Sequence, residues 1–208
     1  MLNLRASLEH TSNPFTLHLA QGLLAPDQVR RLYDTRPREP KRIVRAELEH
    51  EKQYAMNLLY LVENGERNPD AGLGAEWAAL VDDLTSPAFM DWLEEGTGLR
   101  LRHLVTDVGM YTHEDGDFIS IHKDKPNKAL TAVLYVNERW PSDAGGHYEV
   151  HRGPDPGEGP VRSIPPRAGQ FLAFPPTDRS WHAVSPVTTG GALTRLTVQL
   201  EFWFEKNR

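Results

Sequence analysis

Ile119-Ser120-Ile121-His122-Lys123-Asp124 is the stretch of this sequence that carries most information about its fold. Its alternating apolar residues predict a β-strand, and a histidine and a carboxylate follow two residues apart. Residues i and i+2 of a strand point to the same face, with Cα atoms roughly 6–7 Å apart, so His122 and Asp124 can converge on one ion. His182, which opens another strand-like run, is available as a third ligand. Two imidazoles and one carboxylate predict a mononuclear metal site with open coordination positions.

A second His-x-Asp pair, His113-Glu114-Asp115, competes with this assignment. Its surroundings, Thr112 to Asp117, have the composition of a tight turn rich in charge. Such a turn is a poor support for a rigid pair of ligands. We therefore expect His113 to be a solvated loop residue and the metal to bind at the first pair.

Arg195 lies in the strand-like run Leu193 to Phe204. Thr197 shares its face of the strand, whereas Leu196 and Val198 belong to the opposite, apolar face. An arginine buried there needs a partner, and a bound dicarboxylate can accept paired hydrogen bonds from it. The alternative is a surface arginine on an edge strand.

Composition limits the possible functions. The 208 residues suit a single domain covering 1–208, and the net charge of -6 argues against a nucleic-acid partner. The chain has no cysteine, which excludes disulfides, thiolate ligands and cysteine nucleophiles. There is no long apolar run and no signal-peptide core in Met1 to His10. We therefore expect a soluble, cytoplasmic protein without a membrane partner.

The second half of the chain, 101–208, consists of short runs rich in β-branched and aromatic residues, separated by turn signals such as Asp143-Ala144-Gly145-Gly146 and Thr189-Gly190-Gly191. This spacing predicts a compact antiparallel β core, a sandwich or a barrel. Helical patterns in the first half cover Pro26 to Tyr33, Trp77 to Leu84 and Ala88 to Glu95.

Residues 41–60 fit either a helix or a strand. We predict an α+β fold in which residues 1–100 are mainly helical and support the β core that carries the site. The helices are expected to pack on one face of the sheet.

An ordered set of motifs between Leu101 and Phe204 resembles the 2-oxoglutarate/Fe(II)-dependent oxygenase superfamily, in particular its prolyl 4-hydroxylase-like branch. These motifs are His122-x-Asp124, Leu134-Tyr135-Val136-Asn137, Gly145-Gly146, Gly169-x-Phe171-Leu172-Ala173-Phe174, Trp181-His182-Ala183-Val184-x-Pro186-Val187 and Arg195-Leu196-Thr197-Val198. The resemblance implies a double-stranded β-helix, or jelly-roll, core. The gap from His182 to Arg195 is slightly longer than usual in the family, and its glycines indicate a loop extension.

The resemblance also implies the chemistry. His122, Asp124 and His182 would be the iron ligands and the catalytic centre, and Arg195 would pair with the distal carboxylate of 2-oxoglutarate. Fe(II), 2-oxoglutarate and O2 would be required, with ascorbate as a stimulant. Because Asp124 is retained, hydroxylation is expected rather than halogenation, while desaturation and ring formation stay open.

Tyr111 and Tyr135 match tyrosines that line the co-substrate pocket in this branch, although a role as core tyrosines is an equal alternative. We expect His147, Glu149 and Trp181 to contact the substrate, since His147 and Glu149 alternate along one strand face. An ordinary cross-strand pair is the alternative for those two residues.

The expected reaction is hydroxylation of an unactivated C–H bond in an amino acid, a peptide-like molecule or another small metabolite, by a monomer or homodimer. One alternative is a peptidyl-prolyl hydroxylase acting on a protein. Another is a non-catalytic jelly-roll binding module, in which Asp124 and His182 are replaceable. A third is a cupin-like metalloenzyme that does not use 2-oxoglutarate and does not need Arg195.

Overall fold

The computed structural model describes residues 1–38, 42–46 and 52–204. The helices are α1 (Pro26–Asp34), α2 (Ala75–Leu84) and α3 (Pro87–Thr97), with short 3-10 helices η1 (Pro69–Ala71) and η2 (Pro156–Glu158). The strands are β1 (Glu9–Thr11), β2 (Leu17–Ala20), β3 (Arg42–Ala46), β4 (Tyr54–Glu63), β5 (Glu66–Arg67), β6 (Val105–His113), β7 (Ile119–His122), β8 (Lys128–Tyr135), β9 (Tyr148–Val150), β10 (Arg162–Ile164), β11 (Phe171–Phe174), β12 (His182–Val184) and β13 (Arg195–Trp203).

The three helices begin and end where local chemistry favours it. Pro26 and Pro87 occupy the first turns of α1 and α3, where a missing N–H costs nothing. The Ser86 hydroxyl accepts a hydrogen bond from the Phe89 backbone N–H at 3.2 Å and caps α3. α3 ends before Gly98, whose φ of 72° suits glycine. The three helices predicted from sequence are thus confirmed.

The expectation that residues 1–100 are mainly helical is wrong, because β1 to β5 also lie in this half. The segment 41–60, which fits either a helix or a strand by sequence, contains β3 and the start of β4. Residues 41 and 47–51 of this segment lie outside the described residues. β4 pairs with β6 inside the sheet, so the first half builds part of the β core as well as its helical support.

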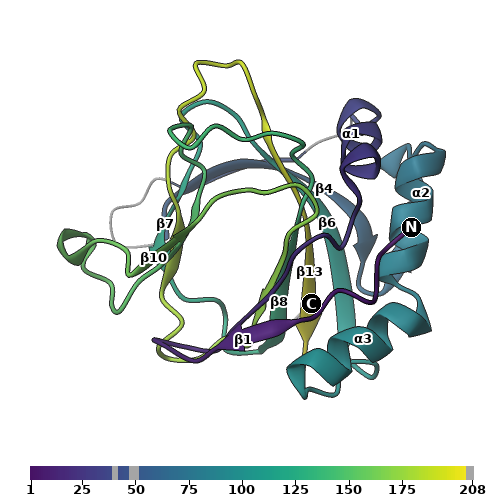
Figure 1. Ribbon diagram of the computed structural model, residues 1–208, viewed down its shortest axis with the longest axis horizontal. Coiled ribbons are helices and arrows are strands. Elements are labelled where there is room, and N and C mark those ends of the chain that lie inside the picture. The colour runs from purple at the N-terminus through teal and green to yellow at the C-terminus, as the bar shows by residue number, and fades with distance from the viewer. Residues whose placement is uncertain (39–41, 47–51, 205–208) are drawn as a thin grey trace.

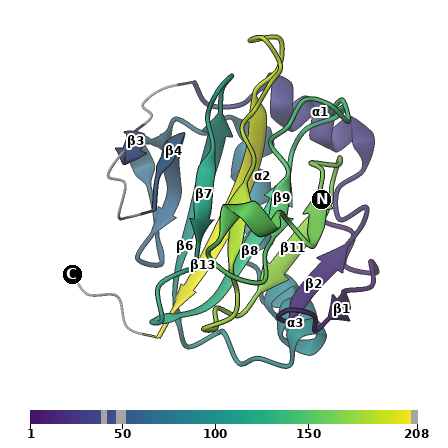
Figure 2. The ribbon, with the colours of Figure 1, turned by 90° about the vertical axis from the view of Figure 1, so that its left-hand side faces the viewer.

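The described strands form one antiparallel sheet that curls into two facing layers (Figures 1 and 2). One layer has the order β1-β2-β11-β8-β13-β6-β4 and the other β7-β12-β9-β10. The two layers are joined where β4 pairs with β7 at a single position, Tyr54 opposite Ile119. Helices α1, α2 and α3 cover the outer side of the larger layer (Figure 1). This is the predicted double-stranded β-helix core with helices on one face.

Side chains alternate along β13 as the pleat of a strand requires. Leu196, Val198 and Leu200 belong to the apolar core between the larger layer and the helices. Arg195 and Thr197 are also buried but point the other way, into the space between the two layers. The interior of the barrel is therefore partly polar, which is unusual for a space that serves packing alone.

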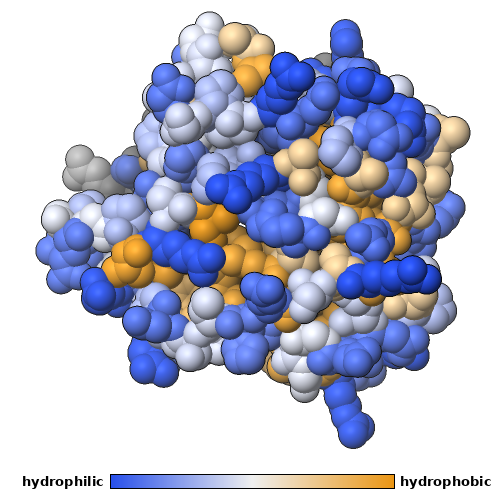
Figure 3. All heavy atoms as spheres, viewed as in Figure 1, coloured by the Kyte–Doolittle hydropathy of each residue, from blue (hydrophilic) through white to orange (hydrophobic). Residues whose placement is uncertain are grey.

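Hydrophilic side chains cover most of the face shown in Figure 3, and apolar ones are visible near its centre. Large hydrophobic side chains exposed in the described part of the chain are Val105, Val161 and Phe204. No described helix has the length and apolar character needed to cross a membrane.

Truncating a side chain under the helices tests this packing. Leu200→Ala removes a fully buried side chain from the sheet–helix core, so we expect urea unfolding of the metal-free protein to show a loss of about 2–5 kcal/mol. Val161→Ala, at a side chain that is 37% exposed, is the control and should change the free energy of unfolding by no more than about 0.5 kcal/mol. Equal, small losses in both variants would contradict the described core.

Candidate metal centre

Strand pairing brings two histidines together at one end of the barrel. His122 is the last residue of β7, His182 is the first of β12, and the two are directly paired across the strands. Asp124 follows two residues after His122. Its Oδ1 lies 3.6 Å from His122 Nε2 and 4.0 Å from His182 Nε2. One ligand atom from each residue lies within 4.8 Å of the others, so all three can contact a single ion.

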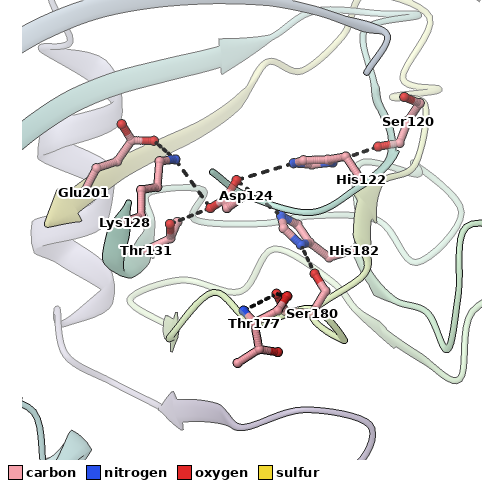
Figure 4. A network of polar contacts seen from close by, with 9 residues as sticks. All are labelled: Ser120, His122, Asp124, Lys128, Thr131, Thr177, Ser180, His182 and Glu201. Atoms are coloured by element: carbon pink, nitrogen blue, oxygen red, sulfur yellow. Dashed lines mark hydrogen bonds and ion pairs between the residues drawn. The ribbon is translucent and has the colours of Figure 1, made fainter. Parts of the chain in front are cut away.

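Backbone carbonyls fix the orientation of both imidazoles. His122 Nδ1 lies 2.8 Å from the Ser120 carbonyl oxygen, and His182 Nδ1 lies 2.8 Å from that of Ser180 (Figure 4). A carbonyl only accepts hydrogen bonds, so each Nδ1 must carry the proton and each Nε2 must offer its lone pair. Metal-binding histidines are commonly held in this tautomer by such a partner.

The Asp124 carboxylate is held in place through one oxygen and left free at the other. Its Oδ2 accepts a hydrogen bond from the Thr131 hydroxyl at 2.6 Å and lies 3.4 Å from Lys128 Nζ. Lys128 also pairs with Glu201 at 2.6 Å (Figure 4). Thr131 and Lys128 both contact Oδ2, so Oδ1 faces the two histidines and keeps its lone pairs available for a metal ion.

The protonation states suit a divalent cation. Burial raises the pKa of Asp124, but the Lys128 ammonium and His122 outweigh it and hold that pKa well below its usual range. Burial lowers the pKa of His122, and it lowers the pKa of His182 to about 3. At neutral pH the site offers two neutral imidazoles and one carboxylate. This nitrogen and oxygen donor set fits non-haem Fe(II).

Arg195 lies buried between the layers, with only 1% of its surface exposed. Its Nε donates a hydrogen bond to the Gly146 carbonyl oxygen at 2.7 Å, and its Cζ lies 5.3 Å from the centre of the Tyr135 ring. No carboxylate forms an ion pair with it within the residues that the structure describes. A buried charge without a counter-ion is costly and points to an anionic ligand.

His113 is not a solvated loop residue, and that expectation is wrong. It is the last residue of β6, fully buried, and pairs directly with Arg195 on β13. Its Nδ1 lies 3.4 Å from Arg195 Nη1, and burial lowers its pKa well below the ordinary value. The strand continues into the charged segment because β13 pairs with it along its whole length, and the turn starts one residue later, at Glu114.

Two buried polar atoms near Arg195, His113 Nε2 and Thr197 Oγ1, have no hydrogen-bond partner, and the Tyr135 hydroxyl has no partner of ordinary hydrogen-bond geometry other than the Arg195 guanidinium itself. Thr197 is the cross-strand neighbour of Tyr135. Native proteins rarely leave buried polar groups unpaired. Their grouping around an arginine without a counter-ion indicates a binding site for the oxygen of a ligand. This group of residues, Arg195, His113, Tyr135 and Thr197, is called the co-substrate cradle.

One cavity connects Arg195 to the histidines. It has a volume of about 80 Å³, and its lining includes His122, Asp124, His182, Tyr111 and Arg195. A compact dicarboxylate could therefore reach the metal ligands with one end and the guanidinium with the other.

A larger groove, of about 1090 Å³, opens onto His122 and Asp124 from outside, and Trp181 lines it. His147 and Glu149 line neither this groove nor the inner cavity. His147 Nδ1 lies 2.9 Å from the Ser163 hydroxyl oxygen, and Glu149 lies 3.5 Å from His151. Of the three expected substrate contacts, only Trp181 lies beside the metal ligands.

Sequence reasoning missed the residues that support the ligands. Lys128 and Thr131 are at the start of β8, a few residues after Asp124, whereas Glu201 is on β13 and reaches Lys128 only through the pairing of β13 with β8. Apart from Lys128 following Asp124 by four residues, nothing in the sequence marks them.

Comparisons with known proteins agree with this geometry. Residues 106–205 match the model of the 2OG-Fe(II) oxygenase superfamily, whereas a search of curated protein sequences gave no significant match. A prolyl-4-hydroxylase from Pseudomonas putida has a similar structure, with 21% identity, 91% of this chain and 93% of that chain covered, and a TM-score of 0.61.

An oxidoreductase of the 2OG-Fe(II) oxygenase family from Burkholderia pseudomallei is similar at 16% identity, with coverages of 92% and 86% and a TM-score of 0.62. HygX from Streptomyces hygroscopicus, solved with nickel and 2-oxoglutarate bound, is similar at 8% identity, with coverages of 90% and 82% and a TM-score of 0.55. These structural likenesses show a shared fold.

The chain contains, in residues 106–205, a domain of the 2OG-Fe(II) oxygenase superfamily, and this domain includes the three metal-ligand candidates and Arg195. It is therefore an enzyme of a class that uses Fe(II), 2-oxoglutarate and O2. This membership decides against a non-catalytic jelly-roll module.

The hydrogen bond from Thr131 to Asp124 provides a test of the ligand geometry. Thr131→Val keeps the side-chain shape but removes the hydroxyl that holds Oδ2, so we expect Fe(II) or Mn(II) to bind roughly 10–100-fold more weakly. Anaerobic metal titration followed by calorimetry measures this change. Thr106→Val, on the same sheet but away from the ligands, should leave the affinity unchanged. Unchanged affinity in Thr131→Val would remove Asp124 from the ligand set.

Acid should destabilise the metal-free protein through its buried histidines. The pKa values of His113, His122 and His182 are lowered in the folded state, while an unfolded histidine titrates near about 6.5. Unfolding therefore takes up protons below that pH, and stability falls as the pH decreases, by up to roughly 1.4 kcal/mol per pH unit for each histidine. Urea unfolding between pH 7 and pH 5 measures the slope, which His113→Asn should reduce. A flat profile in the unmutated protein would contradict neutral buried imidazoles.

Proposed function

We propose that His122, Asp124 and His182 hold Fe(II), that Arg195 binds the distal carboxylate of 2-oxoglutarate, and that the enzyme hydroxylates an unactivated C–H bond of a small or peptide-like substrate. The observation that carries this proposal is the shared cavity between the three ligands and a buried arginine without a described counter-ion. When bound, Fe(II) supplies the coupled decarboxylation of 2-oxoglutarate to succinate and the oxidation of the substrate.

Different residues position the imidazoles and the carboxylate of the proposed metal site. Ser120 and Ser180 orient the imidazoles through their carbonyl oxygens, and Thr131 and Lys128 turn one oxygen of Asp124 toward them. A rigid arrangement of this kind keeps the ligand atoms in place before the metal arrives.

At the other end of the cavity, His113 completes the co-substrate cradle. Arg195 can only donate hydrogen bonds, so His113 Nδ1 at 3.4 Å must accept. The proton of the neutral ring then resides on Nε2, which has no partner. We propose that this N–H, the Tyr135 hydroxyl and the Arg195 guanidinium together donate to a carboxylate of 2-oxoglutarate, with Tyr111 as part of the wall.

The retained carboxylate of Asp124 favours hydroxylation over halogenation, because it occupies the position that a halide would need. The open groove beside the metal ligands admits a free small molecule or a peptide segment. The likeness to a prolyl-4-hydroxylase makes a peptidyl-prolyl substrate the second candidate. Succinate formation across a panel of amino acids, small metabolites and prolyl peptides separates the two.

Removing the arginine tests the co-substrate assignment. Arg195→Met leaves a carboxylate without its charged partner, a loss of about 2–5 kcal/mol, so we expect the KM for 2-oxoglutarate to rise roughly 30- to 4000-fold while Fe(II) affinity stays the same. Asp124→Ala and His182→Ala should instead abolish succinate formation through loss of the metal. Arg162→Met, on the exposed strand β10, is the control. An unchanged KM in Arg195→Met would support a metalloenzyme that does not use 2-oxoglutarate.

A further inference from the structure

The groove outside the metal centre is lined by a cluster of lysines in a chain that contains few of them. The sequence has six lysines and seventeen arginines. Lys52, Lys123 and Lys125 all line the groove that opens onto His122 and Asp124. No arginine is among the groove-lining residues that the structure describes. The lysines and arginines are thus unevenly distributed, and the described lining of this groove contains lysines alone.

The charges along the groove do not cancel. Its acidic lining residues in the described part of the chain are Asp124 and Asp178. Asp124 faces the histidines and is paired with Lys128, while Asp178 is fully exposed and lies 3.6 Å from Lys123. Lys52 and Lys125 form no ion pair with any described residue. The groove is therefore positive although the whole chain has a net charge of -6, and such a cleft concentrates anions.

The other part of the groove is stiff and apolar. Trp181 lines it, and Lys123 Nζ lies 4.9 Å from the centre of one of its rings. Four prolines share the lining: Pro126, Pro154, Pro156 and Pro176. An aromatic face flanked by proline rings offers contact area to a ring or a flat apolar group at little cost in conformational entropy.

We propose that this groove selects a substrate that carries a carboxylate or phosphate group, bound by Lys52 and Lys125, with its apolar body against Trp181. An ammonium is a point charge on a flexible stem and accepts either anion, whereas a guanidinium favours fixed two-point geometry. This inference rests on the proposed function, since the groove ends at the proposed iron ligands. It gives the substrate a chemical class, that of organic anions.

The test compares two probes of the same shape, 3-phenylpropanoate and its primary amide. Binding is measured calorimetrically, without oxygen, to protein loaded with Fe(II) and saturating 2-oxoglutarate, so that the inner cavity is already filled. The acid should bind about tenfold or more tightly than the amide, and added salt should reduce the difference. Phenyl phosphate in a third arm distinguishes a phosphate site from a carboxylate site.

Lysine variants locate the contact. Lys52→Met and Lys125→Met should each weaken binding of the acid roughly fivefold and leave binding of the amide unchanged. Arg179→Met removes a charge beside the groove from a residue that does not line it, and should change neither. The affinity for 2-oxoglutarate should stay constant in Lys125→Met and Arg179→Met, because neither residue lines the inner cavity, whereas Lys52 lines both the groove and that cavity.

Three results would overturn the inference: equal binding of acid and amide, no binding of the acid up to about 20 mM, or a Lys125→Met variant that weakens 2-oxoglutarate binding and leaves binding of the acid unchanged. The last result would make Lys125 part of an entry path for the co-substrate. Two measurements separate this inference from the proposed function. The proposed function fails if 2-oxoglutarate and Fe(II) together produce no visible charge-transfer band with the protein. The calorimetric comparison of acid and amide, repeated on metal-free protein, still tests the groove in that case.

Discussion

Pairing of β7 with β12 is the constraint on which the site depends, because it places His182 directly opposite His122. Neither strand is long, and the two histidines lie at corresponding ends, so a shift of one residue would turn one imidazole to the other face of its strand. The carbonyl oxygens that hold the two Nδ1 atoms belong to the same short segments. The same backbone pairing therefore sets the positions and the orientations of both imidazoles, and the carboxylate of Asp124 comes from the irregular segment after β7.

The barrel interior combines two costly elements that make sense together. At one end an anionic carboxylate and two neutral imidazoles form a cluster that suits a cation. At the other end the buried Arg195 guanidinium suits an anion. The glycine pair Gly145-Gly146 makes the second end possible. Both residues have positive φ, a Cβ on Gly145 would overlap the Pro186 carbonyl oxygen, and the Gly146 carbonyl accepts the hydrogen bond from Arg195. Under the proposed function, binding of iron at one end and of 2-oxoglutarate at the other would offset the desolvation cost of each.

Local patterns in the sequence were enough to predict the β core, the three helices and the meeting of His122, Asp124 and His182. The period of two that suggested the ligand pair holds only in part, since β7 ends at His122 and Asp124 lies in the irregular segment that follows. Prediction failed where strand partners far along the chain decide the outcome. The composition around His113 is typical of a turn, yet pairing with β13 keeps this residue in a strand. The contact of Lys128 with Glu201, which holds the ammonium beside Asp124, depends in the same way on the pairing of β8 with β13.

The central claim is that three side chains from separate parts of the chain share one ion. Anomalous diffraction from a crystal soaked with Fe(II) or Mn(II) and measured at the absorption edge of the metal tests it most directly. The account predicts one strong peak in contact with His122 Nε2, His182 Nε2 and Asp124 Oδ1. A peak elsewhere, or imidazoles bound to separate ions, would contradict it.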